Sequence, residues 1–139
     1  MSGRKRVSVM IFHDELCGVF NGLMTALSLL RNGAEVTIFF GSRGIFAVHR
    51  KKVNELECLP DQPEEIRNKV MARMEAMNLP TPEDILMMLH MEGAGLLACP
   101  LNKEVFEIEE SDFVDGVALA DPETYYTDVV LKAEMNLTF

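Results

Sequence analysis

Two apolar runs, separated by a segment with helical spacing, constrain the fold more than any other feature of the chain. RVSVMIF at 6–12 and EVTIFFG at 35–41 are rich in β-branched and aromatic residues, which is typical of strands buried on both faces of a sheet. Between them, apolar residues recur at helical spacing from Glu15 to Asn32, and Asn32-Gly33 provides a stop signal. The pattern predicts two parallel strands joined by a right-handed helical crossover.

The rest of the chain extends this unit into a larger sheet. The stretch from Gly44 to Glu92 has no strand-like run, and helical patterns broken by prolines predict two or three helices there, with Pro63 and Pro82 at first helical positions. Three more strands are expected, at 95–98, 117–120 and 135–139. A helical turn is expected from Pro100, and a helix with Asp121 as N-cap is expected to run to about Glu134.

These elements predict one α/β domain over residues 1–139. Its architecture is a three-layer α/β/α sandwich with a five-stranded, mostly parallel sheet, related to Rossmann and flavodoxin-like folds. The helices between residues 44 and 92 form an insertion between the second and third strands.

Composition limits the partners that such a chain can have. Its 139 residues are 48% hydrophobic and 25% charged, as in globular proteins, and the formal net charge is −9. This acidic balance argues against a nucleic-acid partner. The apolar run near the start is too short for a membrane span, and the HDE that follows is unlike a signal-peptide cleavage region. We therefore expect a cytoplasmic protein without a membrane segment.

Three cysteines, Cys17, Cys58 and Cys99, are the candidates for chemistry. They form no close pair and no C-x-x-C motif, so free thiols are expected. The three histidines are isolated in the sequence, and no metal site is predicted. GAGLLA at 93–98 fits the dinucleotide pattern G-x-G-x-x-[GA], but it precedes a strand instead of opening a helix. We expect a helix-to-strand turn there and no bound cofactor.

Cys99 stands where an apolar run ends and a proline begins, in LLACPLNKE at 96–104. Pro100 favours an extended conformation for the preceding residue and itself suits the first helical position. Cys99 is therefore expected at a helix N-cap and at the carboxyl end of a parallel strand, where ligand sites form. The helix start favours a thiolate, and we expect a partly exposed sulfur. A nucleophile and a small buried hydrophobe are both open interpretations.

Other residues are expected at the same edge of the sheet. Cys17, in the first turn of the first helix, is a possible second functional thiol, although its side chain could equally face the core. Ser42 and Arg43 follow the second strand and could bind an anion or form a surface turn. His13 could donate or accept a proton. Cys58 has no comparable context and is interpreted as structural or incidental.

Methionines repeat in the predicted insertion, with Met71, Met74 and Met77 at helical spacing and more of them at 87, 88 and 91. Core packing and an adaptable partner-binding face are both open interpretations of this pattern.

The block LLACPLNKEVFEIEESDFVDGVALADPETYY, residues 96–126, resembles the DsrE/DsrF-like family of small sulfur-handling proteins. The shared features are A-C, VF-x-I, an acidic spacer, F-V-D-G-V and an aromatic residue in the next helix. NGAEVTIFFGSRGI extends the resemblance, which is to the branch with a long helical insertion. Asn102, where a serine-like residue is expected, and Ser42-Arg43, in place of a more apolar turn, depart from the family pattern.

The resemblance implies a sulfur carrier or sulfurtransferase, in which Cys99 holds sulfane sulfur as a persulfide and passes it to an acceptor thiol. Within residues 100–102 the backbone N–H groups are those of Leu101 and Asn102, and these and the Arg43 guanidinium are expected to support the anionic persulfide. The implied partners are a second copy of the chain, in a homo-oligomer, and rhodanese-like or TusA-like relay proteins. Whether the protein turns over as an enzyme is left open.

Two other functions are weighed against this one. In the first, the domain binds a small anion or nucleotide, or regulates a partner as an oligomer, and Cys99 only packs. In the second, Cys17 and Cys99 form a redox pair, which requires the two thiols to lie close in space.

Overall fold

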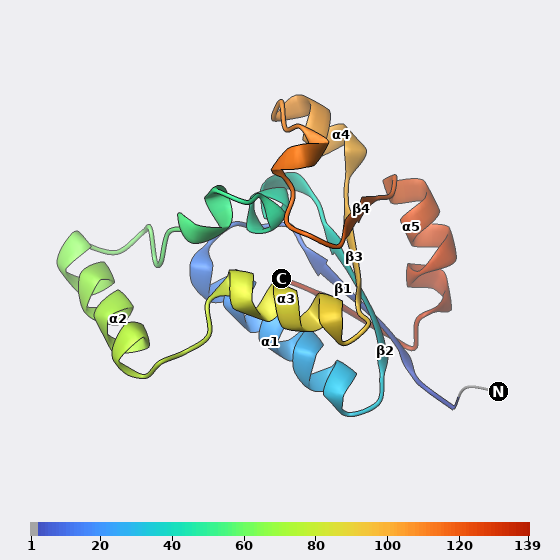
Figure 1. The fold of residues 1–139 in the computed structure, drawn as a ribbon, viewed down its shortest axis with the longest axis horizontal. Helices are drawn as coiled ribbons and strands as arrows, with labels where there is room; N and C mark the ends of the chain where they lie inside the picture. The colour runs from blue at the N-terminus through green and yellow to red at the C-terminus, as the bar shows by residue number, and fades with distance from the viewer. Residues whose placement is uncertain (1–2) are drawn as a thin grey trace.

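The computed structural model describes residues 3–139, which form a five-stranded sheet with the order β4-β3-β2-β1-β5 (Figure 1). The strands are β1 (Arg6–Ile11), β2 (Glu35–Phe40), β3 (Gly95–Ala98), β4 (Val117–Leu119) and β5 (Met135–Thr138). The helices are α1 (Leu16–Arg31), α2 (Glu64–Ala76), α3 (Pro82–Met91), α4 (Pro100–Val105) and α5 (Pro122–Asp128), with short 3₁₀ helices η1 (Ser42–Val48), η2 (Lys52–Asn54), η3 (Glu110–Asp112) and η4 (Val130–Lys132). Every strand pairing within residues 3–139 is parallel, which confirms the predicted α/β fold class.

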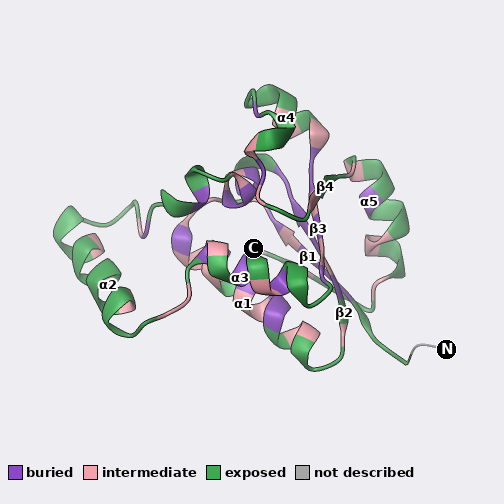
Figure 2. Ribbon diagram, in the orientation of Figure 1, coloured by how far each residue is buried: buried purple, intermediate pink, exposed green. Residues whose placement is uncertain are grey.

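One face of the sheet carries the larger core. Alternate residues of β1, Val7, Val9 and Ile11, are buried on this face, because successive side chains of a strand point to opposite faces. Helices α1 and α3 cover this face (Figure 2). They bury side chains such as Leu23 and Leu89. The predicted strand–helix–strand unit is thus confirmed, with β1 and β2 adjacent and parallel.

The other face has a smaller cover, built around one aromatic residue of α5. Tyr125 is 1% exposed and its ring stacks on Phe39 of β2, with ring centroids 4.7 Å apart. Its hydroxyl is hydrogen-bonded to the hydroxyl of Ser8, which is fully buried in β1. Burial raises the pKa of Tyr125 to about 12, so the hydroxyl keeps its proton and its capacity to donate at neutral pH.

Local signals predicted the helix starts better than the helix ends. Asp121 caps α5, and its side chain accepts a hydrogen bond from the Thr124 amide. The prediction that this helix runs to about Glu134 is wrong, because α5 ends at Asp128 and the chain turns through η4. Glu134 instead bonds to the backbone of Arg6. Pro63 is the N-cap of α2 and not its first residue.

The insertion between β2 and β3 holds one helix away from the sheet. None of the residues of α2 is buried, and the helix extends from the rest of the molecule in Figures 1 and 2. Met71 and Met77 are 43% and 58% exposed. Core packing therefore does not account for these two methionines. Among the helices formed by residues 3–139, none has both the length and the apolar character that a membrane crossing requires.

The bond between Tyr125 and Ser8 can be tested by a double-mutant cycle. Tyr125→Phe should lower the free energy of unfolding by about 1–3 kcal/mol, because it leaves the buried Ser8 hydroxyl without this partner. Ser8→Ala should lower the free energy of unfolding less in the Tyr125→Phe variant than in the wild type, since the double variant has no unpaired hydroxyl. Urea denaturation measures both effects, and strictly additive losses would contradict a direct interaction.

Candidate functional site

Parallel pairing brings the residues that follow β1, β2 and β3 to one edge of the sheet, as predicted. The backbone joins these ends directly. The Gly41 amide donates to the Ile11 carbonyl at 3.1 Å, and the Cys99 amide donates to the Phe40 carbonyl at 3.1 Å. His13, which follows β1, is exposed at this edge.

Cys99 is the N-cap of α4, and Pro100 is the first helical residue, as predicted. Its carbonyl accepts the Lys103 amide at 3.0 Å, which is the first bond of the helix. The expectation of a partly exposed sulfur is wrong, because Cys99 is only 3% exposed. Its side chain belongs to the same face as that of Leu97, where it packs with Phe39 and Tyr125.

Helix α4 is attached to the loop after β2 through Asn102. The Asn102 side-chain oxygen accepts the Ser42 amide at 2.7 Å, and Ser42 adopts a left-handed backbone conformation with φ of 49°. None of the six residues of α4 is buried, and Leu101 is 65% exposed beside the covered thiol. The Asn102 bond is therefore one of the contacts that attach the helix capped by Cys99 to the rest of the domain.

Arg43 does not point a free guanidinium at Cys99. Its Nε and Nη2 atoms donate to the two oxygens of Asp14, at 3.1 and 3.0 Å. The pair lines a hollow of about 290 Å³ whose other walls are Glu15, Phe46, Lys52, Glu55, Leu56, Glu57 and Pro60. The structure therefore assigns Arg43 to the Asp14 carboxylate and to this hollow.

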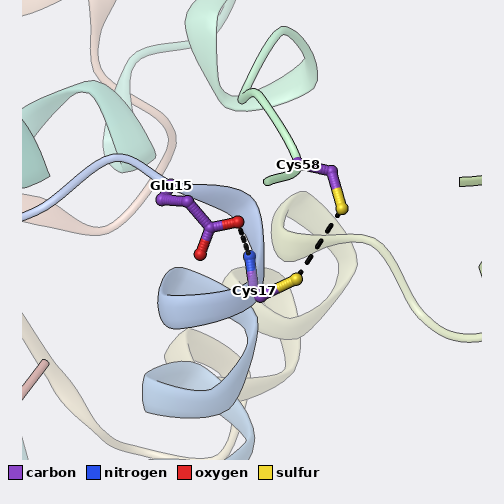
Figure 3. Close-up of side chains that lie close together, drawn as sticks. All are labelled: Glu15, Cys17 and Cys58. Atoms are coloured by element: carbon purple, nitrogen blue, oxygen red, sulfur yellow. Dashed lines mark hydrogen bonds between the residues drawn. The ribbon is translucent and has the colours of Figure 1, made fainter. Parts of the chain in front are cut away.

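Cys17, the possible second thiol of the sequence analysis, lies at the start of α1 and contacts Cys58, a pairing that sequence reasoning missed. The Sγ atoms of Cys17 and Cys58 are 3.7 Å apart (Figure 3). Cys17 is half-buried and Cys58 is 4% exposed. Cys58 is brought there by the insertion. The thiol that Cys17 contacts is thus that of Cys58. Cys99, the partner considered for a redox pair, packs instead in the cluster with Phe39 and Tyr125.

The carboxylate of Glu15 organises this pair of thiols. It caps α1 by accepting the Cys17 and Gly18 amides, and it also accepts the Leu59 amide from the insertion, each at 3.0 Å. Burial alone would raise the pKa of Glu15, but these three N–H groups hold it below its ordinary value. Burial, the Cys58 thiol and the Glu15 charge raise the pKa of Cys17 to about 12. At neutral pH Cys17 is therefore a neutral thiol beside the Glu15 carboxylate.

Comparisons with known proteins agree with the resemblance found in residues 96–126. The sequence profile of the DsrE/DsrF/DrsH-like family matches residues 62–138, which include Cys99. No curated protein matches the chain. Two solved structures are similar over nearly the whole chain. The ychN protein from E. coli is 17% identical, with a TM-score of 0.68, and the match covers 96% of this chain and 99% of that one.

The second structure is MTH1491, a protein of unknown function from Methanobacterium thermoautotrophicum. It is 12% identical, with a TM-score of 0.69 and coverage of 97% of this chain and 99% of that one. At such identities, both similarities establish the fold.

The tether of α4 can be tested through the accessibility of Cys99. Asn102→Ala should raise the rate at which iodoacetamide alkylates Cys99 in the native protein, by up to about tenfold, because a hydrogen bond worth about 0.5–1.5 kcal/mol is lost. Peptide mass spectrometry resolves the rate for each cysteine. Glu104→Ala, on the same helix but bonded only to its neighbour Lys103, is the matched control. Equal rates in both variants would contradict the tether.

Proposed function

Because this chain belongs to the DsrE/DsrF/DrsH-like family, we propose that it is a sulfur carrier that holds sulfane sulfur as a persulfide on Cys99. Family membership indicates a function related to sulfur relay. The observation that supports Cys99 is its position, at the carboxyl end of β3 and at the start of α4. In parallel α/β sheets, ligand sites form at this edge.

The proposed chemistry is an exchange at sulfur without net oxidation. The Cys99 thiolate attacks the outer sulfur of a donor persulfide, the donor S–S bond breaks, and the donor leaves as a thiolate. An acceptor thiolate then attacks the outer sulfur of Cys99–S–SH, and the Cys99 thiolate leaves. The first N–H groups of a helix lack intrahelical partners, so those of Leu101 and Asn102 are the donors that we assign to the anionic persulfide.

The burial of Cys99 supports storage of the sulfur over free exchange. A sulfur packed against Phe39 and Tyr125 is shielded from water and small thiols, so transfer requires local opening of α4. This helix exposes Leu101 and Val105, one turn apart. We assign this apolar pair as the contact for a relay protein of the rhodanese-like or TusA-like class.

We further propose that α2 mediates self-association. Ile66 and Met71 of α2 and Met77, its C-cap, are each more than 40% exposed, and none of the residues of α2 is buried. A hollow of about 640 Å³, lined by Met71, Met74 and residues of α1 and α3, separates α2 from the body. A second copy of the chain would cover both surfaces, and large apolar faces are rarely left in water.

Persulfide loading tests the assignment of Cys99. Incubation of the reduced protein with a persulfide donor should add about 32 Da, one sulfur, to the peptide that contains Cys99. Cys99→Ser should abolish this addition, whereas Cys58→Ser should leave it intact. Mass spectrometry of the digested protein measures both. Loading that survives in Cys99→Ser, or an unmodified Cys99 in the wild type, would favour an anion-binding or regulatory domain instead.

Light scattering tests the oligomer. The wild type should have the mass of more than one copy at tens of micromolar, and a Met71→Glu and Met77→Glu double variant should shift toward the monomer, because both substitutions place a charge on an exposed apolar position of α2 or its C-cap. Glu65→Gln, on the same helix but outside this apolar set, is the control. A strictly monomeric wild type would contradict the proposal.

A further inference from the structure

Glu15, Cys17 and Cys58 form a cluster that the proposed carrier chemistry does not use. One ligand atom from each residue, a carboxylate oxygen or an Sγ, lies within 4.8 Å of the other two. The residues come from two segments, the start of α1 and the insertion before α2 (Figure 3). Because all three are half-buried or buried, the cluster is part of the packed structure and not an exposed acidic patch.

The separation of the two sulfurs matches that of a tetrahedral zinc site. Zinc–sulfur bonds of about 2.3 Å at tetrahedral angles put two thiolate sulfurs about 3.8 Å apart. The observed distance of 3.7 Å between the Cys17 and Cys58 sulfurs agrees with this value, within the tolerance of about 0.2 Å that a metal site allows. A disulfide bond would instead require the sulfurs to approach to about 2.05 Å.

The carboxylate of Glu15 has acceptor capacity left for a cation. A carboxylate offers about four lone-pair positions. Oε2 uses two of them, for the Cys17 and Leu59 amides, and Oε1 uses one, for the Gly18 amide. The Cys17 thiol also hydrogen-bonds to this carboxylate, so the fourth position becomes available to a cation when the thiol loses its proton. The three amide bonds also fix the orientation of the carboxylate, as outer-sphere hydrogen bonds do at metal sites.

Solvent and ions can reach Glu15, the carboxylate member of the cluster, through the hollow beside it. Glu15 lines the hollow of about 290 Å³, together with the carboxylates of Asp14, Glu55 and Glu57. Arg43 and Lys52 also line it, and Arg43 is bound by Asp14. The hollow therefore offers an entry path and room for a water molecule as a further ligand.

We propose that Glu15, Cys17 and Cys58 bind a zinc-class divalent ion, with water from the hollow completing the coordination. Thiolate ligands favour zinc over magnesium or calcium. Binding releases the two thiol protons, and the ion takes their place between the sulfurs. Because Cys17 and Cys58 belong to different segments, the ion would join the insertion to the first turn of α1.

Cobalt(II) serves as a spectroscopic probe for this site. Titration of the fully reduced protein should give a thiolate-to-cobalt charge-transfer band in the near ultraviolet that saturates at one equivalent and is lost when zinc is added. Cys17→Ser and Cys58→Ser should each lose at least half of the band. Glu15→Gln should keep the band but weaken binding about 10- to 100-fold. Cys99→Ser should behave as the wild type, which separates this test from that of persulfide loading.

Two results would overturn the proposal. The first is the absence of a thiolate band in the reduced protein, or a band that keeps its full intensity in both Cys17→Ser and Cys58→Ser. The second is a Cys17–Cys58 disulfide in the isolated protein that, once reduced, binds no cobalt. Circular dichroism of each metal-free variant distinguishes a lost ligand from a lost fold, and the two serine variants decide the outcome if Glu15→Gln does not fold.

Discussion

The parallel pairing of neighbouring strands is the constraint on which the rest of the structure depends. All pairings between the five described strands are parallel, so the chain must return from the carboxyl end of one strand to the amino end of the next before that strand can form. The carboxyl ends of all five strands therefore lie at the same edge of the sheet. Charged and thiol side chains lie at this edge, among them Asp14 after β1, Arg43 after β2 and Cys99 after β3. The helices that make the crossovers also start there, which gives Glu15 and Cys99 their capping positions.

The two thiol centres differ because the sheet has two faces with different cover. Cys99 packs on the face of α5, in a small cluster with Phe39 and Tyr125. Cys17 lies at the start of α1, which packs on the opposite face, and it meets Cys58 from the insertion. One thiol is therefore isolated in an aromatic environment, whereas the other two contact each other beside a carboxylate. This difference is the basis of the separate functions that we propose for them.

Sequence patterns predicted the features that depend on neighbours along the chain. The strand period and the proline after Cys99 act over a few residues, so the sheet and the N-cap of α4 were predicted correctly. The burial of Cys99 depends on Tyr125, which a later helix brings across the sheet. The contact of Cys17 with Cys58 depends on the path of the irregular segment between η2 and α2, which includes a left-handed Leu59 and has no periodic pattern. The burial of Cys99 and the contact of Cys17 with Cys58 both join distant segments, so neither could be predicted from a short stretch of sequence.

The pairing of β1 with β5 has a consequence for how the chain reaches this structure. β5 covers the edge of β1 that β2 leaves free, and the contact between Arg6 and Glu134 spans 128 positions. During synthesis, the buried strand β1 can pair with β2 early, but its other edge has to wait for β5. An unpaired edge of an apolar strand is a template for pairing with other chains. Slow translation or delayed docking of β5 would therefore extend the period in which nascent chains are most prone to aggregate.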